Sequence, residues 1–368
     1  MLRKGWGSVI TVLFLAGSLA SCNNDSDSGS ALAKFIGAIF IGDMEIASTE
    51  ELFSADISGA TVARISGTIT PGGDVDSFQV SPDRRYIAYL ADQDTRNATE
   101  LYVVRASDFA IAKVSGALPV GGNVTNFAWS PDSRHIAYRA DQDTDDVFEL
   151  YTSSLDGTTN DKVSGPLITG GDVTSEFHWS PDSRRIAYTA NQDTNGIYEL
   201  YTSTPDGATN DKASGTLVNV VGVSTTIRWS PDSSRIAYVA NQDTFFTYEL
   251  YTSTPDGTTN DKVSGPAQGG GARVTNFAWS PDGSRIAYRA NQDTDGVTEL
   301  YTSTPDGATN DKASGTLATG GDVINFAWSP DSRRIAYTAD QDTDNVFELY
   351  TSTPDGATNE KSSGTLVT

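Results

Sequence analysis

The sequence predicts an all-β protein, a β-propeller of four-stranded blades. Three observations lead to this prediction: a unit of about 50 residues recurs, each unit holds four β-like runs, and residues 70–368 lack helical periodicity. The proline of a repeated Ser-Pro-Asp step marks the period, because successive copies lie 49 or 50 residues apart, at Pro82, Pro131, Pro181, Pro231, Pro281 and Pro330. A fixed period of this size is typical of repeat architectures.

One copy shows the elements expected of every blade. Turn signals separate its four runs, because Pro181 presets φ in the first turn and Gly207 supplies a positive φ in the third. The runs are 172–180, 184–190, 198–204 and 210–215. Four short strands joined by hairpin turns within 40–50 residues form one propeller blade.

The number of blades follows from counting the motifs. The Ser-Pro-Asp step occurs six times, whereas a Glu-Leu-aromatic step in the third strand occurs seven times. We therefore expect seven blades over 35–368, the first incomplete because it lacks its inner strand; six blades plus an N-terminal edge layer is the alternative. The expected blades are approximately 35–70, 71–119, 120–168, 169–218, 219–267, 268–317 and 318–368.

The N-terminus has the pattern of a targeting segment. Arg3 and Lys4 precede an apolar run too short to span a bilayer, and the run leads to Leu-Ala-Ser-Cys at 19–22. This sequence resembles a bacterial lipobox, which implies a signal peptide over 1–21, lipid attachment at Cys22 and a flexible tether over 22–34. An ordinary secretory signal is the alternative. Cys22 is the only cysteine, so no disulfide can form within the chain.

The charge excludes one class of partner. The formal net charge of −23 argues against nucleic-acid binding, which needs a basic surface. An acidic surface either keeps an exported protein in solution or meets a cationic partner or a metal ion.

The repeat itself resembles a known family. The pattern WSPDxxRIAYxAxQDTxxxxELYTSTPDG, which covers 73–368 and more weakly 35–70, is similar to the PD40, or TolB-like, β-propeller repeat. The resemblance implies a WD40-like propeller and a bacterial cell-envelope setting. With the lipobox, it implies an outer-membrane lipoprotein that faces the periplasm or the cell surface.

Tryptophans recur at one phase of the unit. We expect them to fill space between blades, because the same residue returns at the same position; sugar stacking is the alternative. They are Trp129, Trp179, Trp229, Trp279 and Trp328.

The [Asp/Asn]-Gln-Asp-Thr turn between the second and third strands is the one candidate metal site. Asn291, Asp293 and Asp295, with Glu299 downstream, match the first half of a calcium loop. The bidentate Glu of a full loop is missing, since the twelfth position is Thr302. We favour a turn whose side chains bond local N–H groups, and Ca²⁺ binding stays open as the alternative.

No catalytic constellation is visible. The two histidines occupy different phases of the unit, and the nucleophile-elbow and paired-histidine zinc motifs are absent. The sequence therefore predicts a non-enzymatic scaffold that binds an envelope protein, without a cofactor. The alternatives are a carbohydrate-binding, ligand-binding or hydrolytic propeller that uses its central channel, and a surface adhesin. We interpret the few departures from the repeat, such as Phe245-Phe246 and 218–221, as drift.

Overall fold

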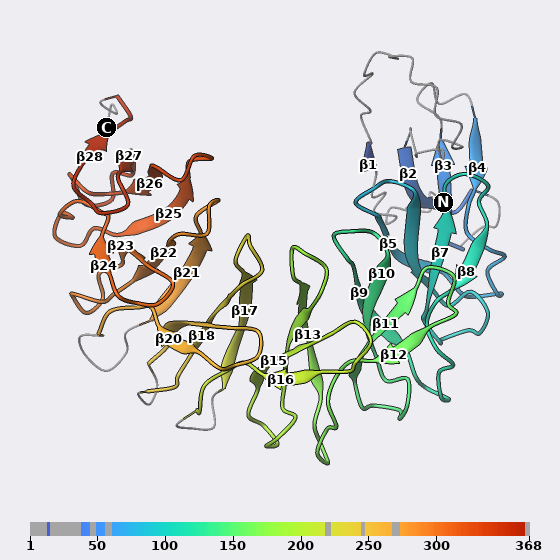
Figure 1. Cartoon of the computed structure of the whole chain (residues 1–368). Coiled ribbons are helices and arrows are strands. Elements are labelled where there is room, and N and C mark those ends of the chain that lie inside the picture. The colour runs from blue at the N-terminus through green and yellow to red at the C-terminus, as the bar shows by residue number, and fades with distance from the viewer. Residues whose placement is uncertain are drawn as a thin grey trace, which may run out of the picture. The chain divides into compact units, whose positions relative to one another are not determined.

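The computed structural model is built from antiparallel strands in chain order (Figure 1). It describes residues 13–14, 38–44, 49–55, 61–217, 222–243, 247–266 and 273–364. These residues form seven four-stranded sheets, as expected of seven propeller blades. The predicted tether and Cys22 lie outside the described residues, as do Phe245-Phe246 and 218–221. Among the described residues, no helix is long and apolar enough to cross a membrane.

The chain divides into two compact units, 1–164 and 165–368. The first unit holds three sheets. Their strands are β1 (Leu13–Phe14), β2 (Ala38–Gly42), β3 (Glu51–Ala55) and β4 (Val62–Arg64); β5 (Val75–Val80), β6 (Tyr86–Ala91), β7 (Glu100–Arg105) and β8 (Ile111–Lys113); and β9 (Val124–Trp129), β10 (His135–Ala140), β11 (Glu149–Ser154) and β12 (Asn160–Lys162).

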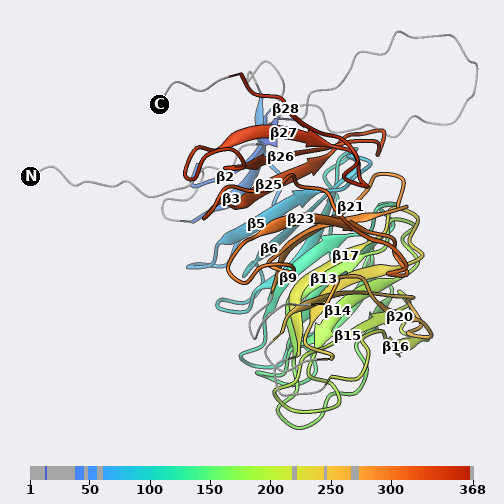
Figure 2. The same ribbon diagram turned by 90° about the vertical axis from the view of Figure 1, so that its left-hand side faces the viewer.

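The second unit holds four sheets, and Figure 2 shows their strands from a second direction. They are β13 (Val173–Trp179), β14 (Ile186–Ala190), β15 (Glu199–Ser203) and β16 (Asn210–Lys212); β17 (Val223–Trp229), β18 (Ile236–Ala240), β19 (Glu249–Ser253) and β20 (Asn260–Lys262); β21 (Val274–Trp279), β22 (Ile286–Ala290), β23 (Glu299–Ser303) and β24 (Asn310–Lys312); and β25 (Val323–Trp328), β26 (Ile335–Ala339), β27 (Glu348–Ser352) and β28 (Asn359–Lys361).

The first sheet differs from the expected blade. Its inner position is not empty, because β1 pairs with β2 through Leu13↔Ile39 and Phe14↔Ala38. The two residues of β1 come from the segment predicted to be a signal peptide. Pairing with them covers backbone groups of β2 that would otherwise face solvent at a sheet edge.

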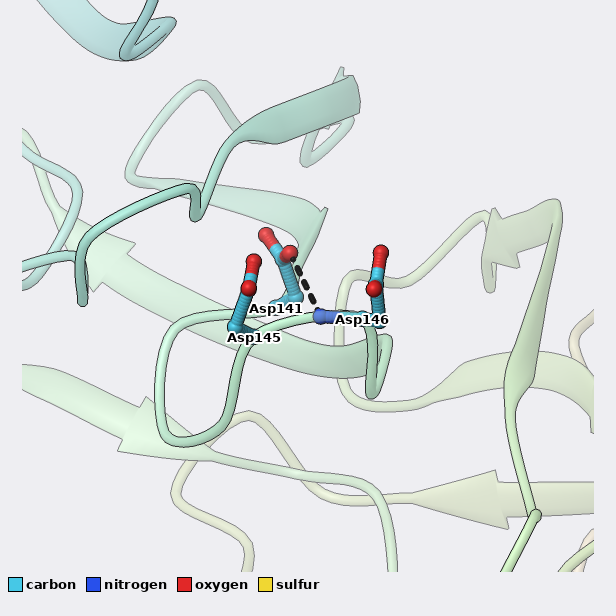
Figure 3. A group of neighbouring side chains, drawn as sticks. All are labelled: Asp141, Asp145 and Asp146. Carbon is cyan, nitrogen blue, oxygen red and sulfur yellow. Dashed lines mark hydrogen bonds between the residues drawn. The ribbon is translucent and has the colours of Figure 1, made fainter.

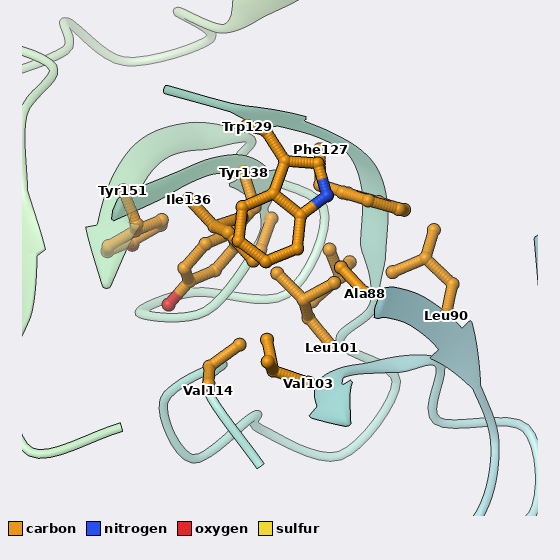
Figure 4. Close-up of a cluster of buried hydrophobic side chains, with 12 residues drawn as sticks. Ala88, Leu90, Leu101, Val103, Val114, Phe127, Trp129, Ile136, Tyr138 and Tyr151 are labelled. Atoms are coloured by element: carbon orange, nitrogen blue, oxygen red, sulfur yellow. The ribbon is translucent and has the colours of Figure 1, made fainter. Parts of the chain in front are cut away.

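The core lies between neighbouring sheets. In the first unit, one apolar cluster joins Leu101 and Val103 of β7 to Phe127 and Trp129 of β9 (Figure 4). Burial of such side chains contributes about 1.5–3 kcal/mol each. Stacked tyrosines repeat within the sheets, as in the Tyr138–Tyr151 pair, whose ring centroids are 5.5 Å apart. Because successive sheets bury the same positions against one another, side chains on both faces of a sheet are apolar, as expected of packed blades.

Strand order places the turns at two ends of each sheet. The Ser-Pro-Asp turn and the turn between the third and fourth strands lie together; we call this the Ser-Pro-Asp end. The [Asp/Asn]-Gln-Asp-Thr turn and the loop to the next sheet lie at the opposite end, which we call the Gln-Asp-Thr end.

Candidate functional site

The glutamine of the Gln-Asp-Thr turn links two sheets. Gln292 accepts hydrogen bonds from the Gly265 N–H of the preceding sheet at 2.7 Å and from the Tyr288 hydroxyl at 2.7 Å. Its amide nitrogen donates to Asn310 at 2.9 Å. The glycine-to-glutamine bond recurs in both units, at Gln93, Gln142, Gln192, Gln242 and Gln341. This position of the motif therefore holds neighbouring sheets together.

The aspartate of the same turn is part of a network of ion pairs and hydrogen bonds. Asp193 lies 3.3 Å from Lys212, and Lys212 also pairs with the carboxylate of Glu199. Glu199 is buried and accepts a hydrogen bond from the Tyr201 hydroxyl at 3.0 Å. Burial, followed by the charges of Glu199 and Asp193, raises the pKa of Tyr201 above its ordinary value. The aspartate thus has a cationic neighbour supplied by the sheet itself.

The first residue of the turn accepts hydrogen bonds from backbone N–H groups and so fixes the conformation of the turn. One oxygen of Asp141 accepts the backbone N–H of Asn123 at 2.5 Å. The other accepts the backbone N–H of Asp146 at 3.0 Å, which Figure 3 shows. Asp145 and Asp146 are exposed, and their carboxylates come within 4.8 Å of that of Asp141. Since Asp141 already holds the loop through both oxygens, the cluster is explained as a turn.

Two residues of the predicted calcium site have partners within the protein. Asn291 accepts the Arg273 N–H at 2.7 Å. Glu299 is buried, accepts the Tyr301 hydroxyl at 2.7 Å and pairs with Lys312. Asp293 and Asp295 are exposed on the turn. Among the described residues, these three carboxylates do not gather as the Asp141 cluster does. Calcium binding by this turn stays a prediction.

The repeated tryptophans lie between sheets. The indole N–H of Trp279 donates to the Arg228 carbonyl of the preceding sheet at 3.1 Å. The same kind of bond is made by Trp129, Trp229 and Trp328. Trp129 and Trp179 are each 8% exposed, which leaves little ring surface for a sugar.

At the Ser-Pro-Asp end, a polar bridge joins strands and sheets. Arg285 of the sheet β21–β24 donates to Thr302 at 2.8 Å and to Asp311 at 2.7 Å. Thr302 in turn donates to the Pro354 carbonyl of the next sheet. The sets that begin at Arg185 and Arg235 repeat this arrangement.

The sheet β5–β8 replaces every member of this bridge. In the sheet β5–β8, the three bridge positions hold Tyr86, Val103 and Ala112, and a cavity of about 840 Å³ lies there against the next sheet. These three residues are not among those that the sequence motifs single out. A comparison of the repeats column by column would have exposed three simultaneous departures, at positions that only the strand register brings together.

Comparison with known proteins supports the fold. Residues 101–247 match the family model described as the lipoprotein LpqB beta-propeller domain. Dipeptidyl peptidase 4 of Porphyromonas gingivalis has a similar structure, with a TM-score of 0.60 at 12% identity, over 88% of this chain and 50% of that one. This chain thus spans half of that peptidase. The fold is a β-propeller, as the TolB-like repeat implied.

Two further solved structures have lower TM-scores. TolB of Acinetobacter baumannii is 14% identical, with a TM-score of 0.36 over 88% of this chain and 78% of that one. The β-propeller domain of the Trilobed protease from Pyrococcus furiosus is 12% identical, with a TM-score of 0.40 over 88% and 93%. None of the curated proteins compared matches this chain.

Proposed function

We propose that this protein is a lipid-anchored β-propeller of the bacterial cell envelope that binds a protein partner and catalyses no reaction. The lipobox-like residues 19–22 and the match to a lipoprotein propeller family support the anchor and the location. Cys22 would carry the acyl chains, and the tether would set the propeller a short distance from the outer membrane.

The non-enzymatic role is supported mainly by one observation: the repeated polar side chains form hydrogen bonds and ion pairs that hold the sheets together. Glutamines of the Gln-Asp-Thr turns bond the preceding sheet, glutamates hold tyrosine and lysine, and tryptophans bond backbone carbonyls. A catalytic pair needs two carboxyl groups in different environments, whereas the repeat gives its carboxyl groups equivalent ones. Rigid display of many similar turns suits binding instead.

The charge of the Gln-Asp-Thr end suggests the kind of partner. Lysine pairs with the motif aspartate in most of these turns, as at Asp143 and Asp342. Further acids of the turns are exposed, among them Asp145, Asp146, Asp295 and Asp344. We propose that the acidic turns of each unit meet basic side chains on the partner, since opposite charges increase association rates and disfavour wrong partners.

Crosslinking in intact envelopes, followed by affinity capture of the protein, tests this proposal. One protein should be enriched with wild type and lost with D145N/D146N/D295N, whereas R184Q, at an exposed arginine of the opposite end, should retain it. Equal capture by the acidic-turn variant would refute the charge argument, and no enriched protein would refute the scaffold. Separately, C22S should release the protein from the membrane fraction, and continued sedimentation with lipid would refute the anchor.

A further inference from the structure

The cavity between the sheets β5–β8 and β9–β12 arises from a concerted change of chemistry. In three sheets of the second unit, an arginine, a threonine and an aspartate form the bridge described above. In β5–β8 these positions hold Tyr86, Val103 and Ala112, so no side chain of the three carries a charge. Loss of one partner alone would leave a partly buried charge unpaired, whereas replacement of all three leaves an apolar surface.

The apolar surface continues onto the next sheet. Leu155 of β9–β12 stands where proline stands in the sheets of the second unit, and it lines the cavity together with Tyr86 and Ala112. All three pack against the cluster of Figure 4, and the Tyr86 ring lies 6.4 Å from that of Trp129. The floor of the cavity is therefore a part of the core that solvent can reach.

An equivalent place in the second unit shows what the bridge does. Between β21–β24 and β25–β28, the corresponding cavity measures about 400 Å³, and Arg285 of the bridge lines it. The cavity beside Tyr86 has about 840 Å³, within the range of sites for small organic ligands. The cavity beside the replaced bridge is thus about twice as large as the cavity beside Arg285.

Charges of both signs surround this apolar floor. Arg85 lines the cavity with a Nε that has no hydrogen-bond partner among the described residues, and its ion pair with Asp83 is long, at 3.9 Å. Asp83 and Asp156 each commit one carboxylate oxygen to their own turn. Hydrogen bonds from Ser154 and Thr158 keep the pKa of Asp156 at about 2, so it is anionic near neutral pH.

The strand next to the cavity exposes apolar side chains. Ile111 of β8 lines the cavity and is 39% exposed. Phe109, two residues before it, is 42% exposed and adopts a left-handed φ of 56° without being glycine. Such a conformation is strained for a bulky residue, and strain of this kind is found most often at functional sites.

We propose that this cavity binds a short apolar peptide with both termini charged, its side chains on the floor of Tyr86, Val103 and Ala112. The terminal carboxylate lies toward Arg85, as guanidinium groups bind carboxylates well. The terminal ammonium lies toward Asp132 and Asp156, which line the cavity from the facing sheet β9–β12. This site goes beyond the proposed scaffold, which uses the opposite end of the sheets.

Titration calorimetry of the full chain with the free dipeptide leucyl-phenylalanine tests the proposal. We expect one site, and at least tenfold weaker binding for the N-acetylated and for the C-amidated dipeptide. The variant Y86R/V103T/A112D rebuilds the bridge of the other sheets and should abolish binding while keeping the melting temperature. R85Q should weaken binding at least tenfold and keeps the proposal testable if the triple variant fails to fold.

The reverse exchange provides a gain of function. R185Y/T202V/D211A removes the bridge from β13–β16, where Arg184 holds the position of Arg85, and should add a second, weaker site. Absence of dipeptide binding to wild type, equal binding of the blocked dipeptides, or unchanged binding by both Y86R/V103T/A112D and R85Q would each overturn the proposal. None of these results affects partner capture by the acidic turns, so each of the two proposals can be refuted while the other stands.

Discussion

The backbone N–H of Gly265 donates a hydrogen bond to the Oε1 atom of Gln292 across the boundary between two neighbouring sheets, at 2.7 Å. The approach is so close that a Cβ atom on residue 265 would lie 2.4 Å from Nε2 of Gln292. Any residue larger than glycine would therefore collide with the Gln292 side chain at this position. The glycine and the glutamine, 27 residues apart in the sequence, act as one joint between blades.

Gly265→Ala should weaken this joint. The added methyl group must displace the buried Gln292 side chain, so we expect a loss of about 1–3 kcal/mol in the free energy of unfolding. Chemical denaturation measures it. Gly364→Ala is the matched control, because Gly364 occupies the same repeat position in the last sheet and a Cβ there would meet nothing within 4 Å. Equal losses at the two glycines would contradict the contact argument.

Two asparagines at the same repeat position should respond differently to alanine. Asn191 accepts the Asp172 N–H at 2.5 Å, so Asn191→Ala should cost about 1–2 kcal/mol of unfolding free energy. Asn241 is fully buried, and neither of its amide atoms has a hydrogen-bond partner among the described residues. Removing an unsatisfied buried amide offsets the lost packing, so Asn241→Ala should cost less than about 0.5 kcal/mol.

The shift in denaturant midpoint between each variant and wild type measures these two costs. The difference has a local cause, because Gly222, at the position of Asp172, adopts a left-handed φ of 75° and its backbone N–H does not bond to Asn241. If Asn241→Ala proved the more destabilising of the two, Asn241 would have a partner and this explanation would be wrong.

The buried pair of Glu299 and Lys312 should behave as a unit. Lys312→Met leaves the Glu299 carboxylate, whose side chain is 5% exposed, without its cation. We expect a loss of roughly 2–4 kcal/mol, below the full cost for a buried pair because Lys312 is a third exposed and water screens it. The double variant E299Q/K312M removes both charges, keeps an acceptor for Tyr301, and should recover at least half of the loss.

Thermal unfolding of the single and double variants tests this coupling. Arg184→Met serves as the control, since its side chain is 85% exposed and its pairing with Asp182 is at 4.0 Å. It should change the unfolding free energy by less than about 0.5 kcal/mol. Additive losses in E299Q and K312M would show that the two charges do not interact.

The repeat predicted the strands well because its signals are local. The predicted run 184–190 contains β14, and 210–215 contains β16. Turn prolines and glycines, together with the aromatic positions, fixed where each strand begins and ends. The first sheet was predicted less well, because β1 pairs with β2 across 25 residues and no repeat motif marks it.

The candidate site was harder to predict, since its chemistry depends on pairing between strands and sheets. The Gln-Asp-Thr turn resembles a metal loop until the partners of Gln292 and Glu299 are known, and these lie in the preceding sheet or on other strands. The departures at Tyr86, Val103 and Ala112 are far apart in sequence. The strand register alone shows that they replace a single bridge.

Buried tyrosines should make the fold sensitive to alkali. Burial is the largest cause of raised pKa values in both stacked rows, and it raises the pKa of Tyr138, Tyr238 and Tyr288 to about 12. Burial also raises the pKa of the tyrosines that stack on these and donate to a glutamate, such as Tyr151 and Tyr301. The unfolded chain releases these protons near the ordinary pKa of about 10, whereas the folded chain keeps them.

The sign of the pH effect follows from this difference. Below about pH 10 both states are protonated and the tyrosines leave stability unchanged; above it, each tyrosine lowers the unfolding free energy by about 1.4 kcal/mol per pH unit until its folded pKa is reached. Denaturant midpoints should therefore fall steeply between about pH 10 and pH 12. Tyrosinate absorbance should appear together with unfolding in the native protein, and near pH 10 in denaturant. Full tyrosinate absorbance at about pH 10.5 in a protein that retains its sheet circular dichroism would show that the tyrosine rows are open to solvent.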